Sequence, residues 1–226
     1  MDLSILVPWR PGDPDRERAW DYIRGYWEGI QSDLIMDIEI VEGNDTGQGP
    51  FNCAMAINDA FKKSTGRAVA IYGADCLPDV DSLECTWQAL NDGLPWVPMY
   101  NRVDYYSKEG TKRILEGEYP CNVETDPRMS VPFQTAFLAM GRAVYKRAGG
   151  HDERFVGWGA EDSAFRRCLY LLFGDQESLD FPMKCLYHAS GHRQMSENNW
   201  NLIREYENIH DAYDLHKYLD ERGSWI

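Results

Sequence analysis

The chain has 226 residues, 43% of them hydrophobic and 27% charged, an ordinary globular composition that excludes intrinsic disorder for most of its length. Lys and Arg number 23 against 37 Asp and Glu, and the resulting net charge of −14 repels duplex nucleic acid and anionic membrane surfaces. The same field repels nucleotides, so a nucleotide ligand would need a divalent cation or a local positive group beside it.

The first third of the chain alternates between strand and helix patterns. Residues 3–8 form a short apolar run that stops at a proline, and Asp13-Pro14 then offers an N-cap and a first-turn proline for a helix. Charged and apolar residues alternate over 35–41, and helical apolar spacing recurs over 51–61. With a third apolar strand at 68–72, the order β-α-β-α-β predicts an α/β protein with a mixed, mostly parallel sheet flanked by helices.

Three polar loops follow the ends of these three strands. They are Pro8-Trp9-Arg10, Glu42-Gly43-Asn44-Asp45 and Gly73-Ala74-Asp75. Because the carboxyl ends of parallel strands share one edge of a sheet, we expect the loops to converge there, where α/β proteins bind their ligands.

The second half of the chain is less regular. We expect a long loop or an irregular hairpin over 99–130, of a kind that often serves as a lid, and a polar-aromatic helix over 197–218. The other expected elements are helices at about 79–91, 142–148 and 160–173, and strands near residue 96, at 131–140 and at 184–187. No repeat or linker stands out, which favours a single domain. With no long apolar run and no leader, we expect no transmembrane segment and a cytoplasmic location.

Asp75 is the first candidate for chemistry. It follows the apolar strand 68–72 in a loop that continues to Pro78. A carboxylate in that place can hold a hard divalent cation, with water and substrate phosphates filling the other positions around the ion. The alternative is that Asp75 is only a turn residue.

The segment 151–162 is the second candidate. Adjacent carboxylates, Glu161 and Asp162, open a predicted helix, and the positive end of the helix dipole should keep both ionised and able to act as a general base. The alternative is an ordinary capped helix start. An exposed Trp158 between Gly157 and Gly159 favours a site, because an indole ring offers a flat apolar platform to a sugar.

Cys185, His188 and His192 form the third candidate. Their C-x2-H-x3-H spacing could supply half of a structural zinc site, but no partner pair is evident. A site in which one of the two histidines binds a metal that is also held by substrate phosphates fits better than a zinc site. For His188 and for His192, the alternative is an ordinary core or surface histidine that binds no metal. The segment Gly47–Asn52 lacks the third glycine of a dinucleotide fingerprint, and the chain has no P-loop motif.

Taken together, these segments resemble a GT-A fold glycosyltransferase. The match lies in Gly149-Gly150-His151-Asp152-Glu153-Arg154-Phe155, then Gly157-Trp158-Gly159-Ala160-Glu161-Asp162, then Arg166 or Arg167. It is similar to the G-x-D-E-x-F…G-W-G-x-E-D…R block of β-1,4-galactosyltransferases, polypeptide N-acetylgalactosaminyltransferases and bacterial family-two-type enzymes. Ile5-Leu6-Val7-Pro8-Trp9-Arg10 resembles the first strand and P-[FW]-R turn of the galactosyltransferases, and Phe51-Asn52-Cys53-Ala54 resembles their F-N-x-A helix. The likeness spans residues 4 to about 192.

The resemblance implies a donor site and a metal site. The residues that it implies for binding a UDP-sugar donor are Pro8, Trp9, Arg10, Glu42, Asp45, Asn52, Gly73, Ala74 and Asp75. It implies that Asp75, with His188 or His192, holds Mn²⁺ or Mg²⁺ on the diphosphate of the donor.

The acceptor side follows from the same resemblance. Trp158, with its flanking glycines Gly157 and Gly159, is implied to pack on a sugar. Glu161 is implied to hydrogen-bond a hydroxyl group, and Asp162 to act as the general base of an inverting transfer.

The resemblance therefore predicts a metal-dependent transferase of a hexose or N-acetylhexosamine in one domain over 1–226. Within it, about 1–98 would bind the nucleotide-sugar, about 99–195 would hold the acceptor and the catalytic groups, and about 196–226 would form a C-terminal helix. The acceptor is left open between a protein, a glycan, a lipid-linked sugar and a modified base, and a bacterial or viral enzyme fits best.

One residue departs from the family pattern. The first Asp of the family's D-x-D motif is replaced by Gly73, and we expect that another carboxylate, Glu42 or Asp45, compensates. The alternative function is a non-catalytic nucleotide-sugar or carbohydrate-binding module on a degenerate GT-A fold.

Overall fold

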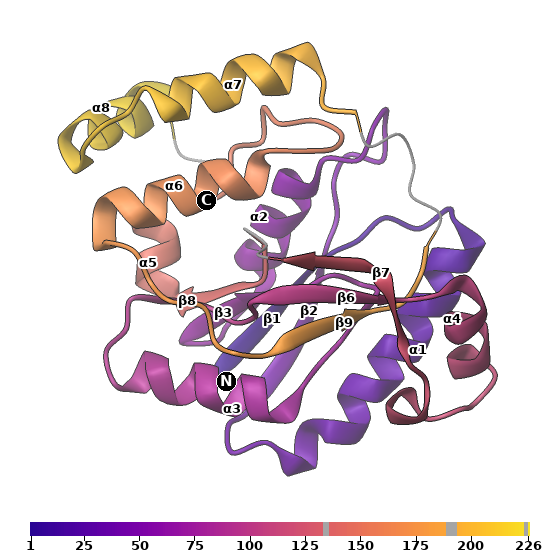
Figure 1. The fold of residues 1–226 in the computed structure, drawn as a ribbon. Helices are drawn as coiled ribbons and strands as arrows, with labels where there is room; N and C mark the ends of the chain where they lie inside the picture. The colour runs from indigo at the N-terminus through magenta and orange to yellow at the C-terminus, as the bar shows by residue number, and fades with distance from the viewer. Residues whose placement is uncertain (133–135, 189–193, 224–225) are drawn as a thin grey trace.

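The computed structural model describes residues 1–132, 136–188, 194–223 and 226, and its first third has the expected order of elements (Figure 1). These elements are β1 (Leu3–Pro8), α1 (Pro14–Ile30), a short 3-10 turn η1 (Gln31–Asp33), β2 (Ile38–Gly43), α2 (Cys53–Lys63) and β3 (Ala68–Ile71). The side chain of Asp13 accepts hydrogen bonds from the backbone amides of Asp15 and Arg16, so the predicted N-cap of α1 is confirmed. The β-α-β-α-β prediction is confirmed with it.

The second half contains more elements than expected. They are β4 (Cys76–Leu77), α3 (Val80–Asn91), β5 (Trp96–Pro98), β6 (Arg102–Tyr106), α4 (Lys108–Leu115), the 3-10 turn η2 (Pro120–Asn122), β7 (Thr125–Pro132), β8 (Leu138–Gly141), α5 (Arg142–Arg147), α6 (Glu161–Phe173), β9 (Pro182–Cys185), α7 (Glu197–Glu207) and α8 (Ala212–Arg222). The single strand expected at 131–140 is wrong: β7 and β8 are separate strands of different sheets. Pro132, which ends β7, cannot donate to a strand ladder.

The strands form two sheets. The larger has the order β2-β1-β3-β8-β5, in which β1 pairs in parallel with β2 and β3, while β8 pairs antiparallel with β3 and β5. The smaller has the order β4-β9-β6-β7, with one parallel pairing, β6 with β9. The α/β class and the mixed sheet flanked by helices are confirmed, and the parallel part of the larger sheet is its three N-terminal strands.

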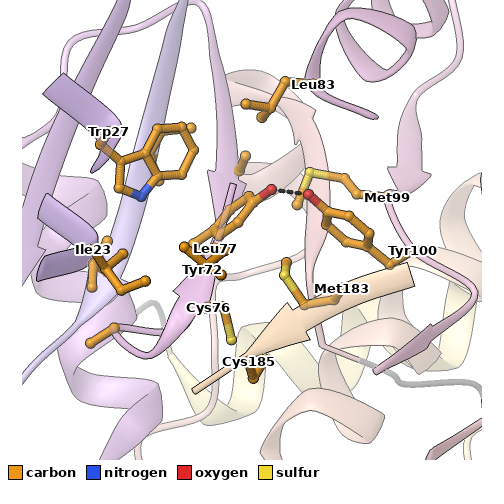
Figure 2. Close-up of a cluster of buried hydrophobic side chains, with 14 of the residues drawn as sticks. Ile23, Trp27, Tyr72, Cys76, Leu77, Leu83, Met99, Tyr100, Met183 and Cys185 are labelled. Atoms are coloured by element: carbon orange, nitrogen blue, oxygen red, sulfur yellow. Dashed lines mark hydrogen bonds between the residues drawn. The ribbon is translucent and has the colours of Figure 1, made fainter. Parts of the chain in front are cut away.

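Both faces of the larger sheet are buried, because alternate residues of β1 point into different cores. Ile5 belongs to a cluster with Trp27 of α1, and Leu6 belongs to a cluster formed with α2, α5 and α6. In the first cluster Tyr72 and Tyr100 point toward each other and their hydroxyl groups are hydrogen-bonded (Figure 2). This packing fixes the chain where β3 passes into the loop that holds Asp75.

The segment 99–130 is not a loose loop, and of our two expectations the irregular hairpin is the nearer one, because β6 and β7 pair antiparallel. β6 lies between β7 and β9, and α4 follows it directly. Tyr106, Ile114 and Val123 are fully or almost fully buried. Helix α4 is hard to detect in the sequence because Gly110, a weak helix former, occupies one of its buried positions. Glycine suits this position because an added Cβ would lie only 3.0 Å from the side chain of Val123.

The C-terminal segment forms two helices where we expected one. Helix α7 ends at Glu207, and Asp211 caps α8 by accepting a hydrogen bond from the amide of Asp214. Both helices lie above α6 in the view of Figure 1. In the part of the chain that the structure describes, no helix combines the length and apolar character needed to span a membrane. The cytoplasmic location stays a prediction.

Candidate active site

The loops that follow β1, β2 and β3 meet at one edge of the larger sheet, as expected. Pro8 is paired with Gly43 in the strand register, and the amide of Trp9 donates to the carbonyl of Gly43 over 2.8 Å. On the other side of β1, the amide of Tyr72 donates to the carbonyl of Leu6 over 3.0 Å. The parallel pairing therefore places the three predicted loops side by side.

Arg10 and Asp45 hold two of these loops together. Arg10 Nε lies 2.8 Å from Asp45 Oδ1, and its guanidinium also donates to the carbonyl of Gly49. The Asp45 side chain is only 2% exposed. Burial raises the pKa of Asp45, but the hydrogen bonds from Arg10 and from the amides of Asn52 and Gly47 together outweigh burial, so the pKa lies below its usual value. Glu42 accepts a hydrogen bond from Trp20 Nε1 at 2.8 Å. Both carboxylates are thus engaged by other residues.

Asn52 has a structural position between two segments of the site. Its side-chain oxygen caps α2 by accepting from the amide of Met55 at 2.9 Å. Its side-chain nitrogen donates to the carbonyl of Glu153 at 2.7 Å. The asparagine is nearly buried, and it ties the start of α2 to the segment that leads to Trp158.

Asp75 and His188 are brought together from the two halves of the chain. Asp75 Oδ2 lies 3.1 Å from His188 Nε2. Burial raises the pKa of Asp75, but the hydrogen bond and charge of His188 outweigh burial, so the pKa lies below its usual value. A carboxylate oxygen and an imidazole nitrogen fit one side of a Mn²⁺ or Mg²⁺ site whose other ligands are water and phosphate oxygens. His192, the other predicted ligand, lies outside the described residues.

No larger metal-binding cluster is found within residues 1–132, 136–188, 194–223 and 226. No group of three or more His, Cys, Asp or Glu side chains there could hold an ion. The pair Asp75–His188 therefore suits an ion that is held jointly by the protein and its substrate, rather than a closed structural site.

The resemblance places Gly73 at the first aspartate of a D-x-D motif, and the local packing favours glycine at this position. A Cβ atom at position 73 would lie 2.9 Å from Asp75 Oδ1 and 2.9 Å from Cys76 Sγ. Real Cβ atoms do not approach other atoms so closely, so a side chain here would displace the carboxylate of Asp75. Glycine keeps Asp75 in contact with His188.

Glu161 and Asp162 occupy the first turn of α6. The N-cap residue is Ala160, with φ of 77° and no capping side chain. Asp162 Oδ1 accepts a hydrogen bond from the amide of Ser163 at 2.7 Å. Glu161 Oε2 is buried and has no hydrogen-bond partner among the described residues. Because Ala160 holds the N-cap position, Asp162 is not the cap of this helix.

The start of the helix does not hold Glu161 in its ionised form, which corrects the expectation for this carboxylate. Burial, followed by the charge of Asp162, raises the pKa of Glu161 to about 7. The helix dipole is weaker than the cost of placing this carboxylate away from water. Near neutral pH, Glu161 can therefore either donate or accept a hydrogen bond.

Two cavities meet at Glu161 and Asp162. The strand-end cavity has a volume of about 150 Å³, and residues at the ends of β1 and β3, including Pro8 and Gly73, line it. The tryptophan cavity has a volume of about 800 Å³, and Trp158 lines it. Glu161 and Asp162 line both cavities, so they lie between a space at the sheet edge and a space that Trp158 lines.

The Gly-Trp-Gly loop presents Trp158 to solvent, as expected. The Trp158 side chain is 55% exposed. Gly157 and Gly159 have φ of 77° and 106°, a region that favours glycine. Asn199 of α7, fully buried, holds this loop by donating to the carbonyls of Val156 and Gly159 at 3.2 and 3.1 Å.

Asn199 and its neighbour Trp200 were not among the predicted site residues. Trp200 also lines the tryptophan cavity and is 52% exposed. A tryptophan inside a mostly polar helix was the available signal for Trp200, and the sequence held no comparable signal for Asn199.

A third space, the basic cavity, borders His188. It has a volume of about 490 Å³, and Arg18, Lys108 and Lys112 contribute three cations to its walls, against the carboxylates of Asp15 and Glu109. None of the three cations forms an ion pair with another described residue. In a protein of net charge −14, this is the kind of local positive group that a nucleotide ligand would need.

Comparisons with known proteins support the fold. No protein-family model and no curated protein sequence matches this chain. The catalytic domain of Drosophila β1,4-galactosyltransferase 7, solved with xylobiose, is similar with a TM-score of 0.52 and 15% identity, over 98% of this chain and 80% of that one. A mutant of the same enzyme, solved with manganese, UDP-Gal and xylobiose, has a TM-score of 0.49 and 17% identity over 73% of this chain. This chain spans 58% of that second structure. The first likeness confirms the predicted GT-A glycosyltransferase fold.

Proposed function

We propose that the chain is a metal-dependent, inverting glycosyltransferase that transfers a hexose or N-acetylhexosamine from a UDP-sugar to a hydroxyl group. One observation carries the proposal: Glu161 and Asp162 line both the strand-end cavity and the tryptophan cavity. A group-transfer enzyme needs such a boundary, because its two substrates must meet at the catalytic group. The GT-A fold supports the proposal, since the similar Drosophila structure is a galactosyltransferase solved with the disaccharide xylobiose.

The donor would lie at the sheet edge. Pro8 ends β1 there, and Trp9 and Arg10 follow it; these three residues would contact the uridine and the diphosphate. Asp75 and His188 would hold the divalent cation on the diphosphate, with Gly73 leaving room for the carboxylate. When bound, Mn²⁺ or Mg²⁺ acts as a Lewis acid that offsets the charge of the departing UDP.

The phosphates would also meet cations of the protein. The basic cavity borders His188, and its residues Lys108 and Lys112 would draw the diphosphate toward the metal pair. This attraction would offset the acidic background of the chain.

The acceptor would lie in the tryptophan cavity, with a sugar or other flat group against Trp158. The carboxylate of Asp162 would take the proton of the attacking hydroxyl group, whose oxygen forms a new bond to the anomeric carbon. The bond between that carbon and the diphosphate oxygen breaks at the same time, and UDP leaves with the electron pair. Glu161, with a pKa of about 7, would hydrogen-bond a substrate hydroxyl in either protonation state.

Release of UDP from a panel of UDP-sugars, with Mn²⁺ and with a chelator, tests the proposal without knowledge of the acceptor. We expect slow release by water with at least one UDP-sugar, and we expect the chelator to abolish it. A binding module on a degenerate GT-A fold would bind the nucleotide-sugar and release no UDP in either condition. That outcome would overturn the proposed activity.

A further inference from the structure

Two half-exposed tryptophans line the same cavity. Trp158 and Trp200 are 55% and 52% exposed, and both line the tryptophan cavity. They come from different elements, the loop before α6 and helix α7, which lies above α6 in Figure 1. Indole rings are usually among the more buried side chains, so packing alone does not account for two of them on one cavity wall.

Hydrogen bonds from the buried side chain of Asn199 hold the backbone of the Trp158 loop against the helix that carries Trp200. Asn199, the residue before Trp200, is fully buried and donates to the carbonyls of Val156, Trp158 and Gly159 at 3.2, 3.4 and 3.1 Å. Its side-chain oxygen accepts from the amide of Val156 at 3.3 Å. The backbone of Trp158 is thus fastened to the helix that carries Trp200. Such an arrangement is prepared before a ligand binds, which lowers the entropic cost of binding.

The polar groups that line the tryptophan cavity match a carbohydrate. Glu161 and Asp162 lie on the same walls, and Arg167 and Glu207 add further charged groups from α6 and α7. A sugar offers apolar C–H faces to aromatic rings and hydroxyl groups to carboxylates and guanidinium groups. A lipid chain would leave these charged groups desolvated without partners, and an acidic peptide would be repelled by the three carboxylates.

We propose that the acceptor is an oligosaccharide of at least two sugar units, with its terminal unit on Trp158 beside Asp162 and its next unit on Trp200. The acceptor role rests on the proposed function, because it takes Asp162 as the general base. Trp200 is then a specificity-determining residue that selects longer glycans over monosaccharides.

The test compares binding of a glycan panel, from monosaccharides to tetrasaccharides, to the full chain and to Trp200→Ala and Trp200→Phe. The matched control is Tyr213→Ala, since Tyr213 is 78% exposed on α8 and does not line the tryptophan cavity. We expect the wild-type protein to prefer a disaccharide or longer glycan over its own terminal monosaccharide. We expect Trp200→Ala to lose about tenfold in affinity for the longer glycan, which is the size of one lost aromatic contact. Its affinity for the monosaccharide should stay unchanged. Trp200→Phe should keep most of the preference.

Several results would overturn the inference. They are a panel with no binder, equal binding of the longer glycan by Trp200→Ala and wild type, and a loss that affects the monosaccharide equally. Transfer to a peptide in preference to every glycan would overturn it as well. Release of UDP by water, measured on the same proteins, should be unchanged in the control Tyr213→Ala. If the wild type released no UDP, the acceptor role would be overturned together with the proposed function. If the wild type released UDP and Trp200→Ala bound the glycans as the wild type does, this inference alone would be overturned.

Discussion

His188 Nε2 lies 3.1 Å from Asp75 Oδ2, and the pairing of β4 with β9 fixes both residues. Cys76, which follows Asp75, faces Cys185 across this pair of strands. The amide of Leu186 donates to the carbonyl of Asp75 over 2.8 Å, which fixes the backbone on both sides of the contact. Backbone pairing therefore places the carboxylate and the imidazole, so changing one side chain should leave the position of the other intact.

Asp75→Asn should abolish metal-dependent turnover and leave the fold intact. The amide keeps the shape of the side chain but removes the negative charge that a divalent cation needs. We expect metal-dependent UDP release to fall by about 10²-fold or more, since charge stabilisation by a bound metal is worth several kcal/mol. Titration with Mn²⁺ should show weakened binding, while circular dichroism should be unchanged. A wild-type rate with Mn²⁺ would remove Asp75 from the site.

Gly73→Asp should weaken metal binding, although it restores the first residue of the D-x-D pattern. The new Cβ would lie 2.9 Å from Asp75 Oδ1 and push that carboxylate away from His188. We expect Mn²⁺ affinity to fall by roughly tenfold, the size of effect seen when the support of a metal ligand is disturbed. Gly25→Ala is the control, because a Cβ at that position in α1 meets open space. Tighter Mn²⁺ binding by Gly73→Asp would contradict the packing argument.

Lys108→Gln and Lys112→Gln should each weaken UDP binding. Both lysines are exposed on the walls of the basic cavity beside His188, so their effect is electrostatic and screened by salt. We expect a roughly two- to fivefold rise in the Kd for UDP at low ionic strength and a smaller rise at high ionic strength. Lys217→Gln on α8, outside that cavity, should leave UDP binding unchanged. Equal effects of all three substitutions would point to net charge rather than to a phosphate site.

The parts of the fold that the sequence predicted are those with local signals. Strand β1 is a short apolar run, and α1 begins with the cap residue Asp13 and a proline. Helix α4 was missed because its buried positions are Gly110, Thr111 and Ile114, of which only the last is a strong apolar signal. Tertiary packing there outweighs helix propensity.

The candidate site divides in the same way. Asp75, Glu161 and Asp162 stand in a recognisable motif, so they could be named from the chain alone. Asn199 could not, because its partners lie 40 to 43 residues earlier in the sequence. The pKa of Glu161 was predicted with the wrong sign, since the helix dipole is visible in the sequence and the burial of the carboxylate is not.

Glu161→Gln should stabilise the protein at high pH and have little effect at low pH. The pKa of Glu161 is raised from 4.5 to about 7, so between these values the folded state binds more protons than the unfolded state. Stability is therefore lost as pH rises through this range, by up to about 3 kcal/mol. Thermal denaturation at about pH 5 and about pH 8 should show a gain in Tm for Glu161→Gln mainly at the higher pH.

The control for this measurement is Glu197→Gln. Glu197 is an exposed first-turn glutamate of α7, so it shares the helix position of Glu161 without its burial. This variant should show no such pH-dependent gain. A gain for Glu161→Gln that is equal at both pH values would contradict the raised pKa.

Asp162→Asn should lower kcat and leave the affinity for the UDP-sugar almost unchanged. An asparagine oxygen can still accept the hydrogen bond that Ser163 now donates at 2.7 Å, so the start of α6 should keep its structure. What is lost is the ability to take a proton, and removal of a general base costs about 10²- to 10⁴-fold in rate. The rate is measured as UDP release at saturating UDP-sugar, with water or an identified acceptor as the attacking group.

The neighbouring carboxylate gives the internal comparison for Asp162→Asn. Successive residues of a helix point about 100° apart, so Glu161 and Asp162 cannot both face the same atom of a substrate. Glu161→Gln should therefore act mainly through the KM for the acceptor, since an amide can replace a hydrogen-bonding carboxyl group. Asp211→Asn, at the N-cap of α8, shows what the same change does at a true cap, where asparagine substitutes well for aspartate. If Asp162→Asn were as silent as Asp211→Asn, the carboxylate would be a structural feature of the helix start and the proton would have to go elsewhere.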